Sequence, residues 1–531
     1  MTTEITYNSW FAEKMNDNGI HSQWLTDHHP ASMPCLQIRL LDWAHTARLA
    51  RQLHMRFSAL WAAEGGKHDE HALYTYMIFA HSEHRHVMIR TPLRSNEPTV
   101  ASITSHYMAA LRMERSMQDM FGITVEGLPD QRHWLKHQHW PEDAHPLRSD
   151  FPADTTMPYC DGQYPFIKAE GSGVYEIPVG PIHAGIIEPG HFRFLAVGEQ
   201  ILNMEERLGY VHKGIEKRLQ GMQAEQAIRL ASRASGDMTV AYGWAFARAC
   251  EQASKIEPPA RANHIRAILC ERERLANHIG DIGAICNDAA FSFMQAQMQR
   301  LREDLARLHQ QLFGHRMMMD LIVPGGVSVD IDKHAQQLLL EQTQQIAAEV
   351  EQLRAIYADH AGIQERVIGS GVVTPEEADA IGLTGYAGRA SGLHVDERVE
   401  EAYPPYDQLQ VRIPEGKLGD VATRVWVRFE EVAEAARIIA TLLASMPAGD
   451  ICNPWTPPEA GVSGIASIES WRGEIICWAR FGIDGRIDRC TLHDPSEVNW
   501  LGLELAVRSV PVPDFPLNNK SFNCSYSGND L

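Results

Sequence analysis

Closely spaced cysteines are the first thing that this sequence lacks. Its 531 residues contain nine cysteines, and the nearest two, Cys477 and Cys490, are thirteen positions apart. A zinc ribbon, a local iron–sulfur ligand set and a dithiol redox motif all need a C-x-x-C spacing, which occurs nowhere. The odd count and the wide spacing indicate reduced, cytosolic cysteines rather than disulfides.

Two further absences concern membranes and nucleic acids. No stretch approaches the roughly 20 apolar residues that a membrane-spanning helix needs, and residues 1–14 have no apolar core behind a basic start. We therefore expect neither a spanning helix nor a signal peptide. The formal net charge is −20 and no Lys/Arg cluster stands out, which excludes the basic face that nucleic-acid binding requires.

The N-terminal third has the pattern of an α/β domain. Short apolar segments predict strands at residues 35–41, 72–80 and 85–90, with a helix over residues 44–60. Residues 140–174 are rich in Pro, Asp, Gly and Ser, which is typical of turns and linkers. We predict one domain over residues 1–155 with a linker to about residue 175, and a second domain over residues 176–531.

Helical periodicity dominates beyond Gly190. Apolar residues recur at helical spacing in three segments, and one of these segments ends at Gly314, a predicted helix C-cap. The three stripes are Met298, Leu301, Leu305, Leu308 and Leu312; Leu339, Ile346, Val350, Leu353 and Tyr357; and Leu275, Ile279, Ile282 and Cys286. We interpret them as core packing in a mainly helical bundle with a small β region, which gives an α+β fold class.

Two groups of histidines raise the question of a metal site. They are His81, His84 and His86, and His133, His137 and His139. A His-x-His spacing can place two imidazoles on one side of a strand. No cysteine or paired carboxylate in the neighbouring sequence completes either set, so we interpret them as surface or interface histidines and predict no metal ligands.

Long ordered motifs carry a family resemblance. Residues 113–152, MERSMQDMFGITVEGLPDQRHWLKHQHWPEDAHPLRSDFP, resemble the signature of the thirty-kilodalton subunit of complex I. Later stretches resemble the forty-nine-kilodalton subunit of complex I and the large subunit of energy-converting nickel–iron hydrogenases. They are EIPVGPIHAGIIEPGHFRF (176–194), EERLGYVHKGIEK (205–217), ERERLANHIGDIGAICND (271–288), GGVSVDID (325–332), GRASGLHVDER (388–398) and ESWRGE (469–474). This order of the two parts resembles formate hydrogenlyase-type large subunits.

The resemblance also shows what chemistry is missing. Hydrogenases of this family hold nickel and iron with two C-x-x-C pairs, because thiolates bind these metals tightly. The first motif falls on residues 233–238, RASGDM, and puts Ser235 and Met238 at the ligand positions. The second puts Ser525 and Gly528 there. All four thiolates are absent, and Cys524 stands alone beside the second motif, so we expect neither a directly bound metal cofactor nor hydrogenase activity.

In complex I the corresponding pocket binds quinone. The resemblance implies that His183, in a β-hairpin loop, hydrogen-bonds a quinone and that Asp288 holds this histidine. It further places Arg233, Ser235, Asp237, Met238, Arg472 and Ser525 around the vestigial nickel–iron cavity. The quinone-binding tyrosine of complex I has no counterpart in register, since the nearest candidate is Tyr242. Arg472 and an aspartate are expected to form a buried charge pair.

Two functions follow from the resemblance. In the first, the chain is a redox-arm oxidoreductase subunit that passes electrons from a neighbouring 4Fe-4S cluster to a quinone or another acceptor. In the second, it is a non-redox coupling or scaffold subunit. The implied partners are an iron–sulfur small subunit, of the twenty-kilodalton type found in complex I, and membrane subunits of ND1-like and antiporter-like types. The implied location is peripheral, on the cytoplasmic face of the inner (plasma) membrane.

Overall fold

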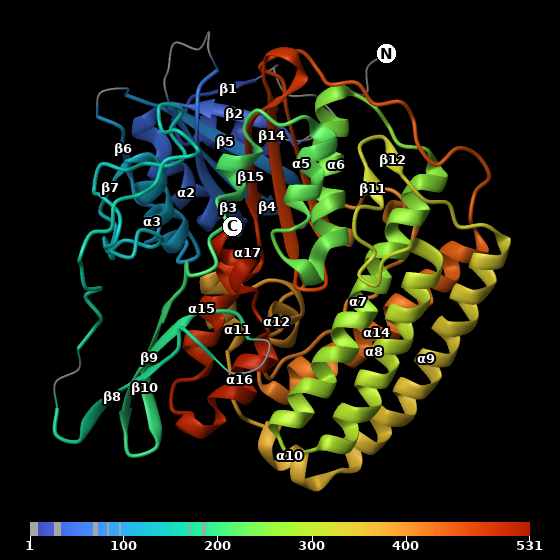
Figure 1. The fold of residues 1–531 in the computed structure, drawn as a ribbon. Helices are drawn as coiled ribbons and strands as arrows, with labels where there is room; N and C mark the ends of the chain where they lie inside the picture. Colours follow the sequence, from blue (N-terminus) through green and yellow to red (C-terminus); the bar gives the residue numbers. More distant parts are fainter. Residues whose placement is uncertain are drawn as a thin grey trace.

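The computed structural model describes residues 9–25, 33–66, 73–81, 84–94, 97–168, 171–183 and 187–531. Its N-terminal part is a five-stranded sheet in the order β1-β2-β5-β4-β3, covered by helices α2 and α3 (Figure 1). The strands are β1 (Ser22–Trp24), β2 (Cys35–Ile38), β3 (Arg56–Glu64), β4 (Leu73–His81) and β5 (His84–Leu93). The helices of this part are α1 (Ser9–Asp17), α2 (Trp43–Gln52) and α3 (Ala110–Phe121).

Two of the predicted strands agree with β4 and β5, although Ala72 lies outside the described residues. The strand predicted over residues 35–41 is shorter, since β2 ends at Ile38. The helix predicted over residues 44–60 is wrong beyond Gln52: the chain turns at His54, where φ is +57°, and continues as β3. Strand β3 is buried on both faces, so its apolar run lacks the alternation that distinguishes a strand from a helix.

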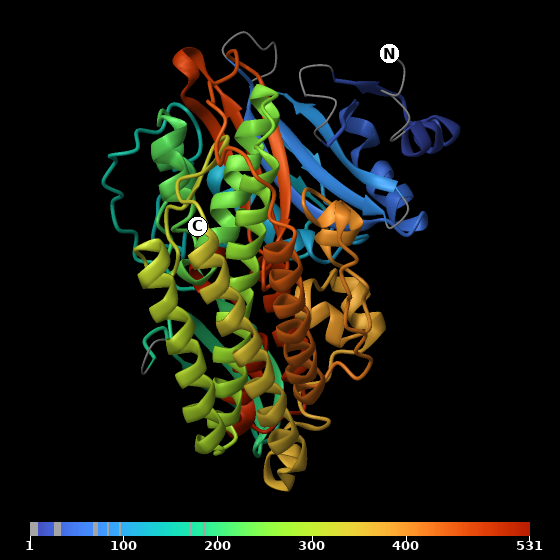
Figure 2. The same cartoon turned by 90° about the vertical axis from the view of Figure 1, so that its right-hand side faces the viewer.

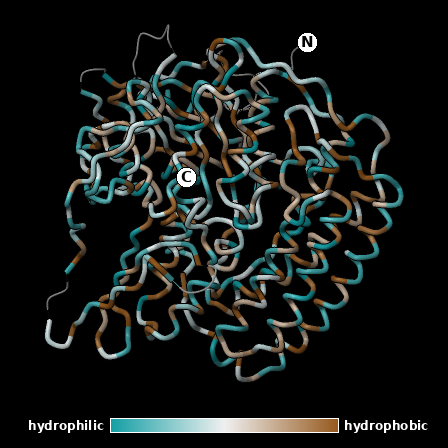
Figure 3. The backbone as a smooth tube through the Cα atoms, viewed as in Figure 1, coloured by the Kyte–Doolittle hydropathy of each residue, from teal (hydrophilic) through white to brown (hydrophobic). Residues whose placement is uncertain are grey.

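The C-terminal part is the predicted helical bundle. Its main helices are α6 (Thr239–Ser254), α7 (Ala260–Asp288), α8 (Ser292–Phe313), α9 (Lys333–Asp359) and α14 (Val421–Ala444), and α7 to α9 and α14 run side by side (Figures 1 and 2). Met298, Leu301 and Leu305 face the core, and Gly314 caps α8 at φ +75°, both as predicted. Hydrophilic and hydrophobic stretches alternate along these helices (Figure 3).

Shorter elements complete the bundle. The helices are α4 (Ile215–Leu219), α5 (Ala224–Ala231), α10 (Ala361–Val367), α11 (Pro375–Ile381), α12 (Gly385–Ala390), α13 (Glu397–Glu400), α15 (Ser496–Ala506), α16 (Phe515–Phe522) and α17 (Tyr526–Asp530). The small β region consists of β8 (Val174–Val179) with β9 (His191–Val197) and β10 (Gln200–Arg207), β11 (Ile322–Val323) with β12 (Gly326–Val327), and β13 (Ser463–Glu469) with β14 (Glu474–Phe481) and β15 (Ile487–His493). The short pair β6 (Thr99–Ala101) and β7 (Thr124–Glu126) belongs to the N-terminal part and contacts α2 and α3. The fold is therefore α+β, as predicted.

The two parts of the chain share an apolar contact. One face of the N-terminal sheet packs on strands β13 and β14, where Trp61 stacks on Tyr76 at 5.0 Å and Tyr76 lies 5.5 Å from Trp478. All three side chains are buried. No helix within the described ranges is long and apolar enough to cross a membrane. The proposed boundaries near residues 155 and 175 stay a prediction.

We expect the bundle to depend on its apolar stripes. Leu339 of α9 has no exposed surface, so Leu339→Ala leaves a cavity and lowers the free energy of unfolding by about 2–5 kcal/mol. The exposed Gln337 in the same helix is the control, and Gln337→Ala changes it by less than about 0.5 kcal/mol. Urea unfolding followed by helical circular dichroism measures both, and equal effects would contradict the assignment of this stripe to the core.

Candidate functional site

Two distant segments meet at Ser235 and Ser525. Ser235 follows α5 and precedes a short 3₁₀ turn, Gly236–Met238, while Ser525 precedes α17. Their Oγ atoms lie 2.9 Å apart although 290 positions separate them, and the Gly528 amide donates to Ser525 Oγ at 2.9 Å. Met238 is fully buried. The two segments that the sequence matched to the hydrogenase ligand motifs are thus in contact through Ser235, Ser525 and Gly528. We call this the Ser235–Ser525 site.

An ion pair joins the two halves of this site. Arg472 donates from Nη1 and Nη2 to the two carboxylate oxygens of Asp237, each at 2.7 Å, and from Nε to the Asn523 carbonyl at 2.7 Å. Burial opposes ionisation of Asp237, but the charge and hydrogen bonds of Arg472 outweigh it and hold its pKa below the usual value. The expected Arg472–aspartate pair is therefore present, with Asp237 as the partner.

Tyr242 belongs to the site as well. It lies one turn after Met238 in α6, and its hydroxyl donates to Asp494 Oδ2 at 2.5 Å. A Cβ on Gly528 would lie 2.1 Å from the same oxygen, so glycine is needed there. Burial, then the negative charge of Asp494, raises the pKa of Tyr242 well above 10, which keeps its hydroxyl protonated. Sequence reasoning set Tyr242 aside as out of register, although its i+4 spacing from Met238 was a usable signal.

A buried glutamate, Glu273, caps the start of α6 directly after the Gly236–Met238 turn. Glu273 of α7 accepts hydrogen bonds from the amides of Val240 at 2.8 Å and Ala241 at 3.2 Å, which are unpaired donors at the start of α6. Burial raises the pKa of Glu273 to about 8. Asn277, one turn further along α7, donates to the Asp237 carbonyl at 2.8 Å. Through these hydrogen bonds, α7 positions the start of α6 and the turn that carries Asp237, and thereby the side chains of Tyr242 and Asp237.

His183 and Asp288 do not form a hydrogen bond with each other. His183 occupies the loop between β8 and β9, as expected, and its Nε2 lies 2.7 Å from the Gly190 carbonyl oxygen. Asp288 is the last residue of α7, half-buried, and burial raises its pKa against the attraction of Lys520. Both residues are described, and neither a hydrogen bond nor an ion pair joins them. The expected histidine–aspartate pair is therefore not formed here, because each side chain has partners on its own segment or on α16.

The loop that carries His183 does reach the C-terminal segment. The Ser527 amide donates to Glu188 Oε2 at 3.1 Å, and a Cβ on Gly190 would lie 2.4 Å from the ring of Tyr526. The Tyr526 ring therefore packs directly on the loop backbone at Gly190. The contact places the loop beside the residues that follow Ser525.

Two other sequence candidates lie outside the site. Arg233 forms a bidentate ion pair with Asp320, at 2.8 Å for each contact, and both side chains are partly exposed. The Arg233 guanidinium therefore faces the surface. The expectation that Arg233 lies around the vestigial nickel–iron cavity is wrong. Cys524 is buried, and burial raises the pKa of its thiol well above 9, which fits a packed and unreactive cysteine.

The histidine groups have mostly structural partners. His133 lies 2.5 Å from Asp119, and His137 and His139 contact the backbone carbonyls of Leu208 and Cys160. In the other group, His81 packs beside Trp10, and the side chain of His84 lies outside the described residues. His86 is 1% exposed and faces the C-terminal part, so it is an interface histidine and not a surface one.

Comparisons with known proteins agree with this architecture. The family described as "Respiratory-chain NADH dehydrogenase, 30 Kd subunit" matches residues 36–157, and "Respiratory-chain NADH dehydrogenase, 49 Kd subunit" matches residues 288–460. The chain is 32% identical to formate hydrogenlyase subunit 5 of Escherichia coli (strain K12), over 84% of this chain and 79% of the relative. The chain belongs to this family of hydrogenase and complex I subunits.

Further relatives include both hydrogenase components and complex I-type subunits. Hydrogenase-4 component G of Escherichia coli (strain K12) is 30% identical over 87% of this chain and 81% of its own length. The C/D subunit of NADH-quinone oxidoreductase from Phocaeicola vulgatus is 28% identical over 73% of this chain and 78% of its own length. Relatives of both kinds thus align with most of the chain, and the chain itself has no C-x-x-C motif.

The ion pair across the site gives a first prediction. Asp237→Asn leaves the buried Arg472 without a counter-charge, and because Asp237 is itself 30% exposed we expect a loss of about 2–3 kcal/mol of folding stability, below that of a fully buried pair. Arg472→Met in the same chain should recover most of this loss. Urea denaturation of the two single variants and the double variant measures it, and additive effects would contradict a direct interaction.

The buried carboxyl group gives a prediction on pH. Glu273 has a folded pKa of about 8 against an ordinary value of 4.5, so the folded state binds the extra proton. The stability that protonated Glu273 contributes is therefore fully present below pH 4.5, the ordinary pKa. It is lost progressively as the pH rises from there to about 8. Because glutamine does not ionise, the Glu273→Gln variant should lose less stability than wild type over this pH range. The variant should therefore be more stable than wild type at pH 8. Thermal unfolding across the pH range tests it, with Glu430→Gln as the partly exposed control.

Proposed function

We propose that this chain is the redox-arm subunit of a membrane-bound, complex I-like or hydrogenase-related, ion-translocating complex. Electrons from a 4Fe-4S cluster in a neighbouring iron–sulfur small subunit reach a quinone or another small acceptor at the Ser235–Ser525 site. The membership in a family that includes formate hydrogenlyase and NADH-quinone oxidoreductase subunits supports the redox-arm assignment.

The observation that carries the proposal is the 2.9 Å contact between Ser235 Oγ and Ser525 Oγ. The two segments that resemble the metal-binding motifs of the hydrogenases are in contact, and hydroxyl oxygens stand at two of the four positions matched to sulfur ligands. Nickel prefers soft thiolates in such sites, so these hard donors do not favour it. Hydroxyl groups instead suit the carbonyl oxygens of an organic acceptor, to which they donate hydrogen bonds.

The neighbouring side chains can serve proton-coupled reduction. Conversion of a quinone to a hydroquinone takes up two electrons and two protons, so the acceptor oxygens need proton donors nearby. Tyr242 holds its proton and is hydrogen-bonded to Asp494, whose pKa burial raises against the charge of Arg472. The Arg472 guanidinium stabilises negative charge that develops on the acceptor. His183, on the loop beside α17, is the second proton donor in this proposal.

The proposal includes partners and a location. An iron–sulfur small subunit, of the twenty-kilodalton type found in complex I, lies against this chain and holds the cluster. ND1-like and antiporter-like subunits form the membrane part, and the chain binds to their cytoplasmic face. Relatives from both branches of the family are named as subunits or components, which fits a protein that acts within a complex.

A second candidate is a coupling subunit without redox chemistry. Two observations favour it: the Asp237–Arg472 ion pair spans the site, and no hydrogen bond or ion pair joins Asp288 to His183. In this case changes in protonation at Asp494, the hydrogen-bond partner of Tyr242, are transmitted to the membrane subunits, and no acceptor binds.

We expect Tyr242→Phe, in the complex purified from membranes, to lower quinone reduction by at least about 100-fold, because it removes a proton donor. Turnover with a short-chain ubiquinone is measured together with reduction of the cluster by electron paramagnetic resonance. Tyr210→Phe, 40% exposed and outside the site, is the control and keeps full turnover.

Three outcomes separate the candidates. Cluster reduction that persists while quinone turnover is lost supports the redox proposal. Wild-type complex that reduces its cluster but no quinone supports the coupling subunit. Stoichiometric nickel in the purified complex, together with hydrogen production, would contradict both.

A further inference from the structure

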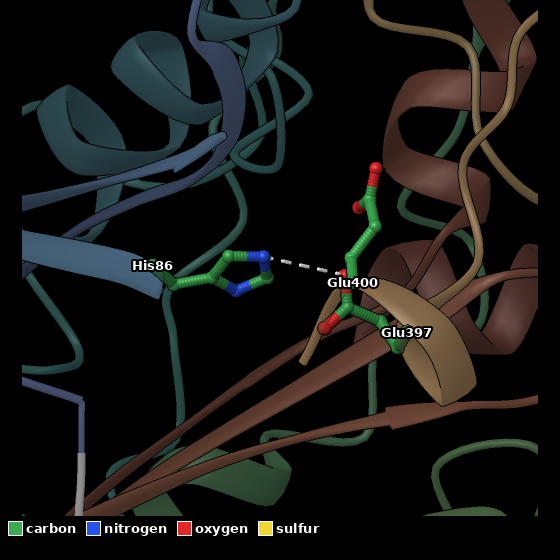
Figure 4. Close-up of side chains that lie close together, drawn as sticks. All are labelled: His86, Glu397 and Glu400. Atoms are coloured by element: carbon green, nitrogen blue, oxygen red, sulfur yellow. Dashed lines mark ion pairs between the residues drawn. The ribbon is translucent and has the colours of Figure 1, made fainter. Parts of the chain in front are cut away.

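A cluster of metal-binding side chain types lies away from the Ser235–Ser525 site. His86 of β5 points toward Glu397 and Glu400 of α13 (Figure 4). His86 Nε2 lies 3.6 Å from Glu397 Oε1, and ligand atoms of all three residues lie within 4.8 Å of one another. Donors that each lie about 2.0–2.2 Å from one metal ion are separated by up to about 4.4 Å, so the cluster is close to ligand geometry.

A fourth side chain has a buried oxygen without a hydrogen bond. Glu474 of β14 places Oε1 4.0 Å from His86 Nδ1, and its side chain is 4% exposed. This oxygen accepts no hydrogen bond, whereas Oε2 of the same carboxylate accepts one from Arg56 at 2.6 Å. Burying an unsatisfied carboxylate oxygen is unfavourable, and a bound cation supplies the missing partner.

The charges of the cluster do not balance. Arg56 donates to Glu397 at 2.9 Å and Glu400 at 3.0 Å, besides Glu474. One guanidinium offsets one of these three carboxylates, which leaves two negative charges when the imidazole is neutral. A divalent cation has the charge that would neutralise the cluster.

Two cavities give an ion access to these residues. One, of about 60 Å³, is lined by His86 and Ser467 among others, and its lining also includes Arg248 and Glu401. The other, of about 390 Å³, is lined by Arg56 and Glu400. Residues of the cluster therefore border two cavities.

We propose that His86, Glu397, Glu400 and Glu474 bind one divalent first-row transition-metal ion, such as Zn²⁺ or Mn²⁺. The imidazole selects these ions over Mg²⁺ and Ca²⁺, which prefer ligand sets made only of oxygen. The ion joins the N-terminal sheet to α13 and β14, and so fastens the N-terminal part of the chain to the C-terminal part. This role is independent of the chemistry at the Ser235–Ser525 site.

The first test measures metal content. The full chain is stripped with a chelator, dialysed against Zn²⁺ or Mn²⁺ and analysed by mass spectrometry of the elements. With 26 histidines in the chain, background binding is subtracted by comparison with variants. We expect wild type and His81→Gln to retain about one ion more than His86→Gln, whose affinity falls at least about tenfold. Equal retention by wild type and His86→Gln would overturn the proposal.

The second test separates a metal site from an ion-pair network. Arg56→Gln removes the positive charge that competes with the ion, so Zn²⁺ should bind more tightly and raise the thermal midpoint of the variant by at least about 2 °C relative to the stripped protein. Glu400→Gln in the same background should abolish that increase. If the cluster only forms salt bridges, Arg56→Gln lowers the midpoint equally with and without metal, and the proposal fails.

Discussion

The ion pair between Asp237 and Arg472 is the interaction on which the candidate site depends. It joins the turn before α6 to the β13–β14 hairpin, while the same arginine holds the Asn523 carbonyl and Trp471 donates to the Asp237 carbonyl at 3.0 Å. Three chain segments that are remote in sequence thus meet at the Arg472 guanidinium. A bidentate arginine–carboxylate contact fixes both distance and orientation, and in this chain it links the two segments of the Ser235–Ser525 site.

Helix α7 provides the frame behind this pair. Its charged residues are buried and paired with α12, α13 and α14: His278 Nε2 lies 2.7 Å from Glu431, Arg389 donates to the same glutamate at 2.8 Å, and Arg398 donates to Glu271 at 3.0 Å. Removing one member of such a network leaves an uncompensated buried charge, so the network fixes the position of the helix. From that helix Glu273 and Asn277 reach the Ser235–Ser525 site.

The chain therefore combines an inherited framework with an altered centre. The framework is that of hydrogenase and complex I subunits, whereas the ligand positions contain serine, methionine and glycine. Hydroxyl, phenol and guanidinium groups donate hydrogen bonds and move protons, and thiolates bind soft metals. Replacing one set by the other changes the chemistry available at the Ser235–Ser525 site.

Much of this was determined by the sequence alone, because it rests on local pattern and ordered motifs. The bundle stripes around Leu301 and Leu339, the Gly314 cap and the absence of four cysteines needed no structure. Tertiary structure decided the rest. A strand buried on both faces, such as β3, has no alternation of apolar and polar residues that would identify it. The partners of Arg233 and Tyr242 lie 87 and 252 positions away. The carboxylates beside His86 lie more than 300 positions further along the chain. Contacts over such separations depend on how helices and sheets pack, which no local spacing encodes.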